Sequence, residues 1–460
     1  MTTKVQKLFE KHLLSHLDFW RQELLSGDLS SVELSLRSSL QQVHNGVMEI
    51  LLNDVGQSDE LAECLKGFGN KLGAKNLKLR EVRLQLGTGS WVRYKSYYAT
   101  RLEPSEKGVE LGSRHLSLMY WGCLKKSTPM YYGLVSQYST ICPSYDIARQ
   151  LLAYQGVYAK TKRVRMLSIA VGGLASELGL SAQLDEGEDM SGKRVVVQVD
   201  GGRSRLRENK DAYTKKGYQK YAANWREPKL IAIHVIDENG DIIRSVSKPI
   251  YRAAVQDAKA CMEDLVQTLK LLKADQALEV QFLADGAPFI WRRIRRAFQK
   301  AGVPAKKITY TLDYYHAVQH LKTLSEFLPL TKAERNKQFE RWKTWLWDGL
   351  ANSIVRQFKR LMKEKKSKLS EKMTTTLKYF KRHHDRMQYK RFKKAKLLCG
   401  SGLVESAIRR VINLRFKGPS TFWYLDNLNN MLVLRCAFLS GRWDNLMNAI
   451  QLRIKTGGTV

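Results

Sequence analysis

The order of extended and helical segments between residues 193 and 328 is the feature that most restricts the fold of this chain. Runs of β-branched residues bounded by turn residues predict strands, and apolar residues at helical spacing predict helices. The expected strands cover 193–198, 229–236, a short segment after the turn at 237–240, 278–283 and 308–312, and the expected helices cover 253–272 and 288–302. Three strands therefore come first, and strands then alternate with helices.

That order, β-β-β-α-β-α-β-α, is the topology of the RNase H-like fold, in which helices flank a mixed sheet. We expect the first part of this α/β core at residues 191–328 and its end at 399–460. Residues 329–398 continue the helical pattern, so we expect an all-helical insertion between the two parts of the core.

Changes of pattern divide the chain before the core into three regions. Helical spacing of apolar residues predicts a helical unit at 1–75, and a period of two from Leu77 predicts a strand-rich hairpin region at 76–143. In 144–190, a break near Gly156 separates two helical segments, the second of them basic. This pattern fits a DNA-binding helix-turn-helix, and it fits an ordinary helical hairpin with a solvated basic face equally well.

The charge balance of the chain indicates a polyanionic partner. The 460 residues include 78 Lys and Arg against 44 Asp and Glu, a formal net charge of +34 that is spread along the sequence. Double-stranded DNA is the natural candidate, although ribosomal, chromatin and membrane-surface proteins are basic too. The six cysteines form no CxxC pair, which argues against a zinc ribbon and a disulfide framework. No apolar run approaches the roughly eighteen residues of a membrane span, so we expect a cytoplasmic, nucleoid-associated protein without membrane contact.

The insertion carries the densest positive charge. Residues 356–396 hold seventeen Lys or Arg and three acidic residues, which predicts a surface that faces DNA. The alternative is a solvated charge run on a helical surface. Three tryptophans, Trp342, Trp345 and Trp347, cluster just before it, and core packing is a more common role for such a cluster than base stacking.

Three carboxylates stand out by their positions. Asp200 ends the first expected strand, Asp285 ends the fourth, and Glu405 lies in a late helix over 403–416. The first and fourth strands of an RNase H-like sheet are adjacent, so the two aspartates could share a metal ion with Glu405 as a third ligand. Such oxygen ligands suit two Mg²⁺ ions, with Mn²⁺ as a substitute, and a pair of ions can promote in-line displacement at phosphorus.

Each acid also has a simpler explanation when it is taken alone. The two aspartates precede glycine and are common turn residues, and Glu405 could pair with Arg409 one turn later. Their joint occurrence in the order strand, strand, late helix favours the metal site.

The helix over 403–416 is expected to have two faces. One face should anchor the helix on the sheet through Leu403, Val404, Ala407, Ile408, Val411 and Leu414. The other should reach the DNA backbone through Ser406, Arg409, Arg410, Asn413 and Lys417.

Five sequence blocks between about Val195 and Trp443 resemble the signature blocks of DDE transposases of the ISKra type, relatives of the Mutator-like transposases. The blocks are "VDGGRSRLR", "WREPKL", "LADGAPFIW", "LDYYHAVQHL" and "CGSGLVESAIRRVINLRFKG". By this resemblance Asp200, Asp285 and Glu405 are the catalytic triad, and Asp313 and His316 form an auxiliary pair. The resemblance also implies an all-helical insertion before the final glutamate.

The same blocks suggest which residues contact DNA. These are Arg203, Arg205, Trp225, Arg226, Lys229, Arg409, Arg410, Arg415 and Lys417. The chain departs from the family in two respects: it lacks N-terminal cysteine pairs, and its "RFKGPSTFW" segment is an imperfect match.

The leading hypothesis is therefore a transposase that binds terminal inverted repeats and catalyses Mg²⁺-dependent strand cleavage and strand transfer. Because two element ends must be held together, a homodimer or larger assembly is expected. A catalytically inactive DNA-binding regulator and an RNase H-like structure-selective nuclease are the alternatives.

Overall fold

The computed structural model describes residues 1–101, 114–243, 245, 247–419 and 421–456. These residues form two compact units, the first comprising Met1–Gln183 with Trp443–Val460 and the second Leu184–Arg442. The chain thus leaves the first unit, forms the second, and returns to the first through its last helix. The expected region 399–460 is divided between the units at Arg442.

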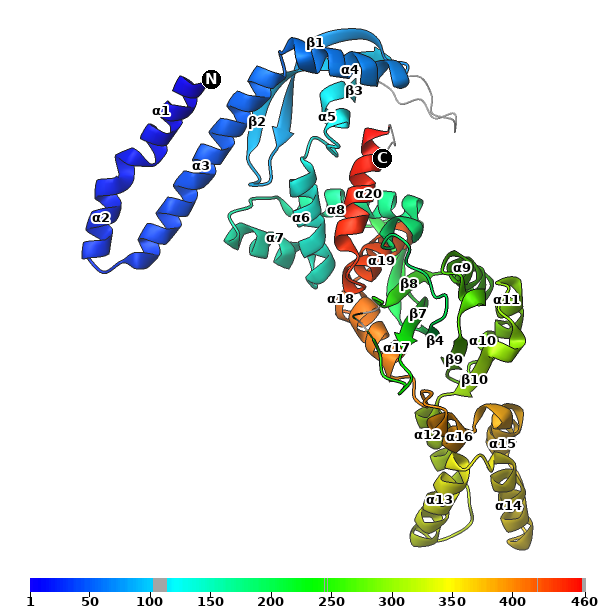
Figure 1. The fold of residues 1–460 in the computed structure, drawn as a ribbon. Coiled ribbons are helices and arrows are strands. Elements are labelled where there is room, and N and C mark those ends of the chain that lie inside the picture. The colour runs from blue at the N-terminus through cyan, green and yellow to red at the C-terminus, as the bar shows by residue number, and fades with distance from the viewer. Residues whose placement is uncertain (102–113, 244, 246, 420, 457–460) are drawn as a thin grey trace. The chain divides into compact units, whose positions relative to one another are not determined.

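The second unit is built on a five-stranded mixed sheet (Figure 1). Its strands are β4 (Arg194–Gly201), β7 (Pro228–Ile236), β8 (Ile250–Val255), β9 (Glu279–Ala284) and β10 (Ile308–Leu312). Their order is β10-β9-β4-β7-β8, with β4, β9 and β10 parallel and β7 antiparallel to both of its neighbours. The first and fourth strands of this sheet are therefore adjacent, as expected, and the arrangement is compatible with the RNase H-like fold.

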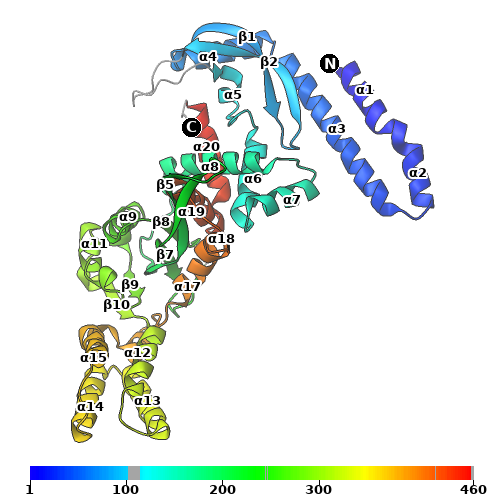
Figure 2. The ribbon, with the colours of Figure 1, turned by 180° about the vertical axis from the view of Figure 1, so that it is seen from behind.

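Helices cover both faces of this sheet, as Figures 1 and 2 show. On one side lie α9 (Ala258–Leu271) and α11 (Ile294–Lys300), which follows the short α10 (Pro288–Trp291). On the other lie α17 (Gly402–Ile408), α18 (Leu414–Phe416) and α19 (Leu425–Leu439). Every residue of β7 is buried, because a strand covered on both faces exposes neither row of side chains.

Two details of the sheet differ from the sequence-based expectation. In the described part of the segment after the turn at 237–240, the expected strand is represented by a single bridge, Ile236 to Ile242, and the third strand of the sheet is β8 instead. The expected helix at 253–272 begins later, at Ala258, because Asp257 caps it by accepting a hydrogen bond from the Ala260 amide at 2.8 Å. A two-stranded sheet of β5 (Ser204–Tyr213) and β6 (Gln219–Arg226) lies between β4 and β7 in the chain.

Four helices form the insertion: α13 (Lys332–Trp347), α14 (Ala351–Glu364), α15 (Glu371–His383) and α16 (Tyr389–Lys394). The chain enters it from α12 (Tyr314–Glu326), which starts directly after β10. Trp342 is fully buried and donates to Gln357 Oε1 at 2.7 Å, so it packs as a core residue. Trp347 is half-buried against the ring of Tyr314, at 5.2 Å between centroids.

The first unit joins a helical hairpin, a small sheet and a helical cluster. Its N-terminal helices are α1 (Thr2–His12), α2 (Leu17–Leu25), α3 (Leu29–Val55) and α4 (Asp59–Lys71). The sheet has the order β1 (Lys75–Gln85), β2 (Trp91–Arg101), β3 (Arg114–His115). The remaining helices are α5 (Leu116–Tyr120), α6 (Pro129–Ile141), α7 (Tyr145–Tyr154), α8 (Thr161–Leu178) and α20 (Trp443–Lys455).

None of the described helices combines the length and the apolar character needed to cross a lipid bilayer.

Candidate active site

Three aspartates lie level with one another at the ends of three adjacent parallel strands. Asp200 is near the end of β4, Asp285 directly follows β9, and Asp313 directly follows β10. The parallel registers of β4 with β9 and of β9 with β10 align these three positions. Because side chains alternate between the faces of a sheet, level residues on neighbouring strands point to the same face. The fold therefore gathers three carboxylates at one edge of the sheet.

Glu405 comes to this edge from α17, which packs on β4 and β7. Its Oε1 accepts a hydrogen bond from Ser401 Oγ at 2.6 Å, and the backbone N–H of Ser401 donates to Asp313 Oδ2. Ser401 therefore connects the carboxylate of α17 with the carboxylate that follows β10. This contact joins residues 88 positions apart in the sequence.

The segment that returns from the insertion is held in place by hydrogen bonds to its main chain, two of them from the side chain of Gln281. Gln281 of β9 donates to the Leu398 carbonyl at 2.6 Å and accepts from the Leu398 amide at 3.0 Å. The Tyr314 amide donates to the Cys399 carbonyl at 2.9 Å. These bonds fix the start and the end of the insertion side by side, so the insertion leaves the position of α17 intact.

Asp313 is fully buried and serves as the N-cap of α12. Its Oδ1 accepts from the His316 amide at 2.6 Å and lies 3.1 Å from His316 Nδ1. Burial raises the pKa of Asp313, but the hydrogen bonds from His316 and Ser401 outweigh it, and the net pKa lies below the ordinary value. Asp313 is therefore a buried anion that orients two neighbours.

The surroundings of His316 raise its pKa and so favour its positively charged form. The hydrogen bond with Asp313 raises the pKa of His316, burial lowers it, and the negative charges of Asp313, Asp285 and Glu405 raise it further, so that the net pKa is raised. The protonated ring is thus favoured among the carboxylates.

Among the carboxylates at the sheet edge, Asp200 has a raised pKa. Burial raises the pKa of Asp200 to about 6, and the charges of Asp285 and Glu405 add to the effect, while the Gly201 amide and His316 oppose it. The Gly201 amide donates to Asp200 Oδ1 at 2.6 Å. A group of partly buried carboxylates that repel one another is an electrostatic setting that favours a bound cation.

Among the described residues, one group of three potential ligands lies within 4.8 Å of one another, and it comprises Asp313, His316 and Glu405. The predicted set of Asp200, Asp285 and Glu405 does not reach that spacing, although the three are close enough to shift the pKa of Asp200. Both sets share Glu405. The oxygen ligands at this edge suit Mg²⁺, and an imidazole is more compatible with Mn²⁺ or Zn²⁺.

Tyr379 of α15 is a neighbour of the site that the sequence patterns did not indicate. A Cβ added at Gly286 would lie 2.2 Å from its ring, so glycine is required where the chain turns after Asp285. The Tyr379 ring also lies 4.0 Å from that of His320, between centroids. Burial and the charges of Asp285 and Asp313 raise the pKa of its hydroxyl, which is buried without a hydrogen-bond partner among the described residues. The insertion thus supplies one wall of the site.

The residues expected to contact DNA occupy different environments. Arg203, Arg409 and Lys417 are exposed, and Arg410 is half-buried with its Nη2 donating to Tyr251 Oη at 3.2 Å.

Three expected DNA-contact residues lie on the small β5–β6 sheet. Trp225 is 52% exposed, and the Arg205 guanidinium lies 5.3 Å from its ring centroid. Arg226 forms an ion pair with Glu208 at 2.5 Å. These side chains are arranged at the surface of the second unit.

Lys229 and Arg415 are corrections to the expected DNA contacts, because both are buried. Lys229 is 7% exposed, pairs with Glu227 at 3.2 Å and lies over the Phe289 ring at 4.1 Å. Arg415 is 3% exposed and lies over the Trp423 ring at 5.0 Å. Both cations therefore contribute to packing inside the unit.

A π-helical turn at Arg409–Asn413 explains why Leu414 does not anchor the helix as expected. A π turn adds a residue to the helix, so the side chains after it are rotated from the positions that a regular α-helix gives. Leu414, which was expected to anchor the helix, is 58% exposed, and Phe416 is fully buried instead. The residues before the turn keep the expected phase, since Val404, Ala407 and Ile408 are buried.

Neither the protein-family models nor the curated proteins include a match to this chain. Among solved structures, the chain is similar to the Drosophila P element transposase strand transfer complex, at 12% sequence identity and a TM-score of 0.26. The match covers 74% of this chain and 84% of that chain.

Replacing Asp200 with Asn is expected to stabilise the metal-free protein at neutral pH. The pKa of Asp200 is raised from its usual 3.8 to about 6 in the folded state. Stability should therefore fall as the pH rises through this interval, by at most about 3 kcal/mol, because ionisation is harder in the folded chain than in the unfolded one. Asn does not ionise, so the advantage of Asp200→Asn should be small near pH 4 and complete by pH 7.

The measurement is urea unfolding in a chelating buffer across this pH range, with Asp211→Asn as a control at an exposed aspartate. An advantage for Asp200→Asn that is the same at every pH would contradict the account.

Proposed function

We propose that this chain is a DDE-type transposase that binds the terminal inverted repeats of a mobile element and cleaves and transfers DNA strands. The observation that supports it most is that three carboxylates come from separate elements to one edge of the sheet. Asp200 and Asp285 are level on adjacent strands, and hydrogen bonds through Ser401 and Asp313 hold Glu405 at the same edge. The resemblance of five sequence blocks to ISKra-type transposases implies the same three residues.

The proposed metal ligands are Asp200, Asp285 and Glu405, with Mg²⁺ or Mn²⁺ as the ion. When bound, a pair of such ions activates the attacking oxygen and stabilises the leaving oxygen at phosphorus. Asp313 and His316 are proposed as positioning residues, because the hydrogen bonds of Asp313 are already directed to His316 and Ser401. Water is the first nucleophile, and the freed 3′-hydroxyl is the second.

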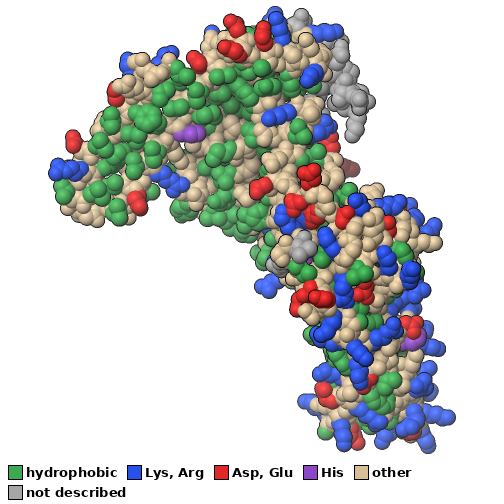
Figure 3. All heavy atoms as spheres, viewed as in Figure 1, with side chains coloured by type: hydrophobic (Ala, Val, Ile, Leu, Met, Phe, Trp, Pro, Cys, Tyr) green, Lys and Arg blue, Asp and Glu red, His purple; other side chains and the backbone are tan. Residues whose placement is uncertain are grey.

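The insertion is proposed to hold the DNA backbone. Nearly all of the Lys and Arg residues in 356–396 are exposed, whereas the apolar face of α14 is buried through Ile354, Phe358 and Met362. The cations thus lie on the outer surface of a helical layer whose inner surface packs. Figure 3 shows Lys and Arg side chains gathered over this part of the molecule.

A second copy of this chain is proposed to cover the N-terminal helical hairpin. No residue of α1 is buried and only Trp20 of α2 is, although both helices pack along α3. Large apolar side chains that remain exposed include Phe9, Leu14, Leu17, Phe19, Leu24, Leu25, Leu29, Leu34 and Leu40. Figure 3 shows hydrophobic side chains spread over α1, α2 and α3.

This apolar surface needs a partner because helices in proteins depend on packing for stability, and patches beyond a few hundred Å² are uncommon on monomers. A transposase must bring two element ends together, so a matching hairpin from another copy is the occupant that the proposed function requires. A symmetric pair would bury the same face of both copies.

Glu405→Gln is expected to reduce strand cleavage by more than about 100-fold while leaving DNA binding nearly unchanged. Loss of an outer-shell partner of a metal ligand already costs 10–100-fold in typical sites, and a ligand should cost at least as much. Cleavage of duplex DNA carrying the ends of the element should be measured with Mg²⁺, together with binding by fluorescence anisotropy.

Glu238→Gln makes the same change at an exposed turn and should leave cleavage intact. Cleavage by Glu405→Gln at the wild-type rate would exclude Glu405 as a ligand. Cleavage without joining to target DNA in the wild-type protein would favour the nuclease alternative.

Replacing Lys359, Lys363, Lys378 and Lys381 with Gln is expected to flatten the salt dependence of DNA binding. All four are exposed on α14 and α15. Each lost phosphate contact should reduce the slope of log K against log[salt] by about 0.9 for duplex DNA. An unchanged slope would show that this charge run is merely solvated surface.

Leu25→Gln combined with Leu34→Gln is expected to shift the chain toward the monomer. These leucines are 71% and 68% exposed, so their replacement should change the assembly and leave the fold of one copy intact. Sedimentation equilibrium measures the mass, and Leu278→Gln, at a leucine 64% exposed in the second unit, is the control. A monomeric wild-type protein, or an unaltered dimer in the double variant, would contradict the proposed pairing.

A further inference from the structure

Two consecutive lysines in the first unit adopt a backbone conformation that side chains rarely take. Lys125 and Lys126 have φ angles of 49° and 58°, in the left-handed region. They form a two-residue turn in which the Leu124 and Ser127 backbones exchange hydrogen bonds of 3.0 and 2.9 Å. Asn-Gly is the usual sequence in a turn with two left-handed residues, because a Cβ is unfavourable there.

The turn is held in place by contacts that lie behind it. Arg163, in the first turn of α8, donates to the Lys125 carbonyl and to Ser127 Oγ, both at 2.7 Å. The Gln85 amide donates to the Lys126 carbonyl at 2.9 Å, and Arg163 Nε donates to Gln85 Oε1 at 3.1 Å. These hydrogen bonds therefore hold the backbone of the turn in its strained conformation. Strained conformations persist at functional sites when the surrounding structure holds them in this way.

Left-handed lysines also occur singly at helix ends elsewhere, at Lys273, Lys366 and Lys396. The pair at 125 and 126 differs from these because both of its side chains line one cavity.

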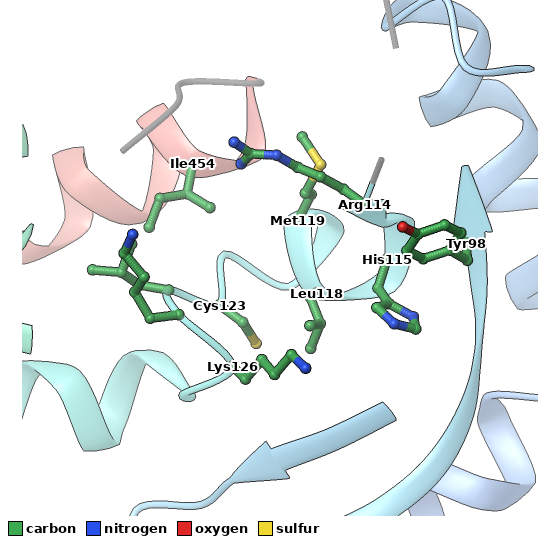
Figure 4. A pocket seen from close by; sticks show the side chains of 10 residues that line it. Tyr98, Arg114, His115, Leu118, Met119, Cys123, Lys126 and Ile454 are labelled. Atoms are coloured by element: carbon green, nitrogen blue, oxygen red, sulfur yellow. The ribbon is translucent and has the colours of Figure 1, made fainter. Parts of the chain in front are cut away.

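That cavity has a volume of about 410 Å³ and is lined by Lys125, Lys126, Arg114 and His115, with no acidic residue among the described lining side chains. Figure 4 shows Arg114 along one side and Lys126 along another, with Leu118 and Met119 between them. The floor is therefore apolar and the rim is cationic. The paired ammonium groups of Lys125 and Lys126 at such a cavity favour a bound anion.

His115 adds a buried polar atom to the lining of the cavity. Its Nδ1 is buried and makes no hydrogen bond to a described residue. Burial and the nearby charges of Lys126 and Arg80 lower the pKa of His115 to about 4, so the ring is neutral near pH 7 and can donate one N–H. Buried polar atoms are nearly always paired, and an anionic oxygen in the cavity would supply the missing partner.

We propose that the cavity formed by the Lys125–Lys126 turn, Arg114 and His115 binds a phosphate group of duplex DNA. The choice of DNA as the source of the phosphate rests on the proposed function. It is supported by the exposed Lys160 and Lys162 at the start of α8, which lie next to the Arg163 that braces the turn. The turn then brings two ammonium groups to the phosphate, and α8 contacts the turn through Arg163.

Two double variants separate charge from backbone strain. Lys125→Asn with Lys126→Gly removes both charges and relieves the left-handed conformation, whereas Lys125→Gln with Lys126→Gln removes the charges and keeps the strain. Both should weaken DNA binding alike and reduce the slope of log K against log[salt] by up to about 1.8. The Asn-Gly variant alone should raise the thermal midpoint, by roughly 2–8 °C.

Lys273→Gly relieves one left-handed lysine in the second unit, so it should raise the midpoint and leave the phosphate cavity unaffected. Binding of a labelled random-sequence duplex should be measured by fluorescence anisotropy over a range of NaCl, with thermal unfolding recorded for every protein. The inference is supported when both double variants bind DNA more weakly and with a smaller slope of log K against log[salt]. The slope for Lys273→Gly should differ from the wild-type slope by no more than about one unit.

The remaining outcomes overturn the inference in distinguishable ways. Wild-type affinity and slope in both double variants would exclude DNA from the cavity and leave the proposed transposase function standing. If sodium phosphate stabilises the wild-type protein and neither double variant, while DNA binding is equal in all, the source is free phosphate. A wild-type protein that binds no duplex DNA at all would overturn both the cavity assignment and the proposed function.

Discussion

The carboxylate of Asp313 is the interaction on which the arrangement of the site depends. It is 0% exposed, it caps α12, and it accepts hydrogen bonds from His316 and from the Ser401 amide. The chain enters the insertion through α12, the helix that Asp313 caps, and it has returned from the insertion by Ser401. One buried anion therefore joins the start of the insertion to its end, and Ser401 extends the link to Glu405. This link acts together with the Gln281–Leu398 hydrogen bonds and the packing of α17 on β4 and β7 to hold Glu405 beside the strand ends.

The same edge illustrates how a site can oppose the stability of its own fold. Burial and neighbouring negative charge raise the pKa of Asp200, so the metal-free chain carries unfavourable electrostatic energy at neutral pH. A cation would relieve that repulsion, and this relief is part of the affinity expected for it. The protonated form of His316 is favoured in the same place, where its charge partly offsets the carboxylates.

The sequence predicted the parts of the fold that rest on local pattern. The central strands were recognisable because their β-branched runs stop at Asp-Gly, and the same turns located Asp200 and Asp285. The β5–β6 sheet was not predicted because its residues are mostly polar and partly exposed, so the sequence lacks a strong alternation of apolar and polar residues there. Leu414 was assigned to the wrong face because the π turn at Arg409–Asn413 changes the phase of the helix. Tyr379 reaches the site through the tertiary fold of the insertion, and a local sequence pattern does not predict such a long-range contact.

The central claim is that Asp200, Asp285 and Glu405 hold the catalytic metal, and its most direct test is the position of the ion itself. Crystals grown with Mn²⁺ should be measured for anomalous scattering. The account predicts a peak in contact with oxygens of Asp200, Asp285 and Glu405, at roughly 2.0–2.2 Å as for small hard cations. A peak held by Asp313, His316 and Glu405, with Asp200 and Asp285 both out of contact, would contradict it.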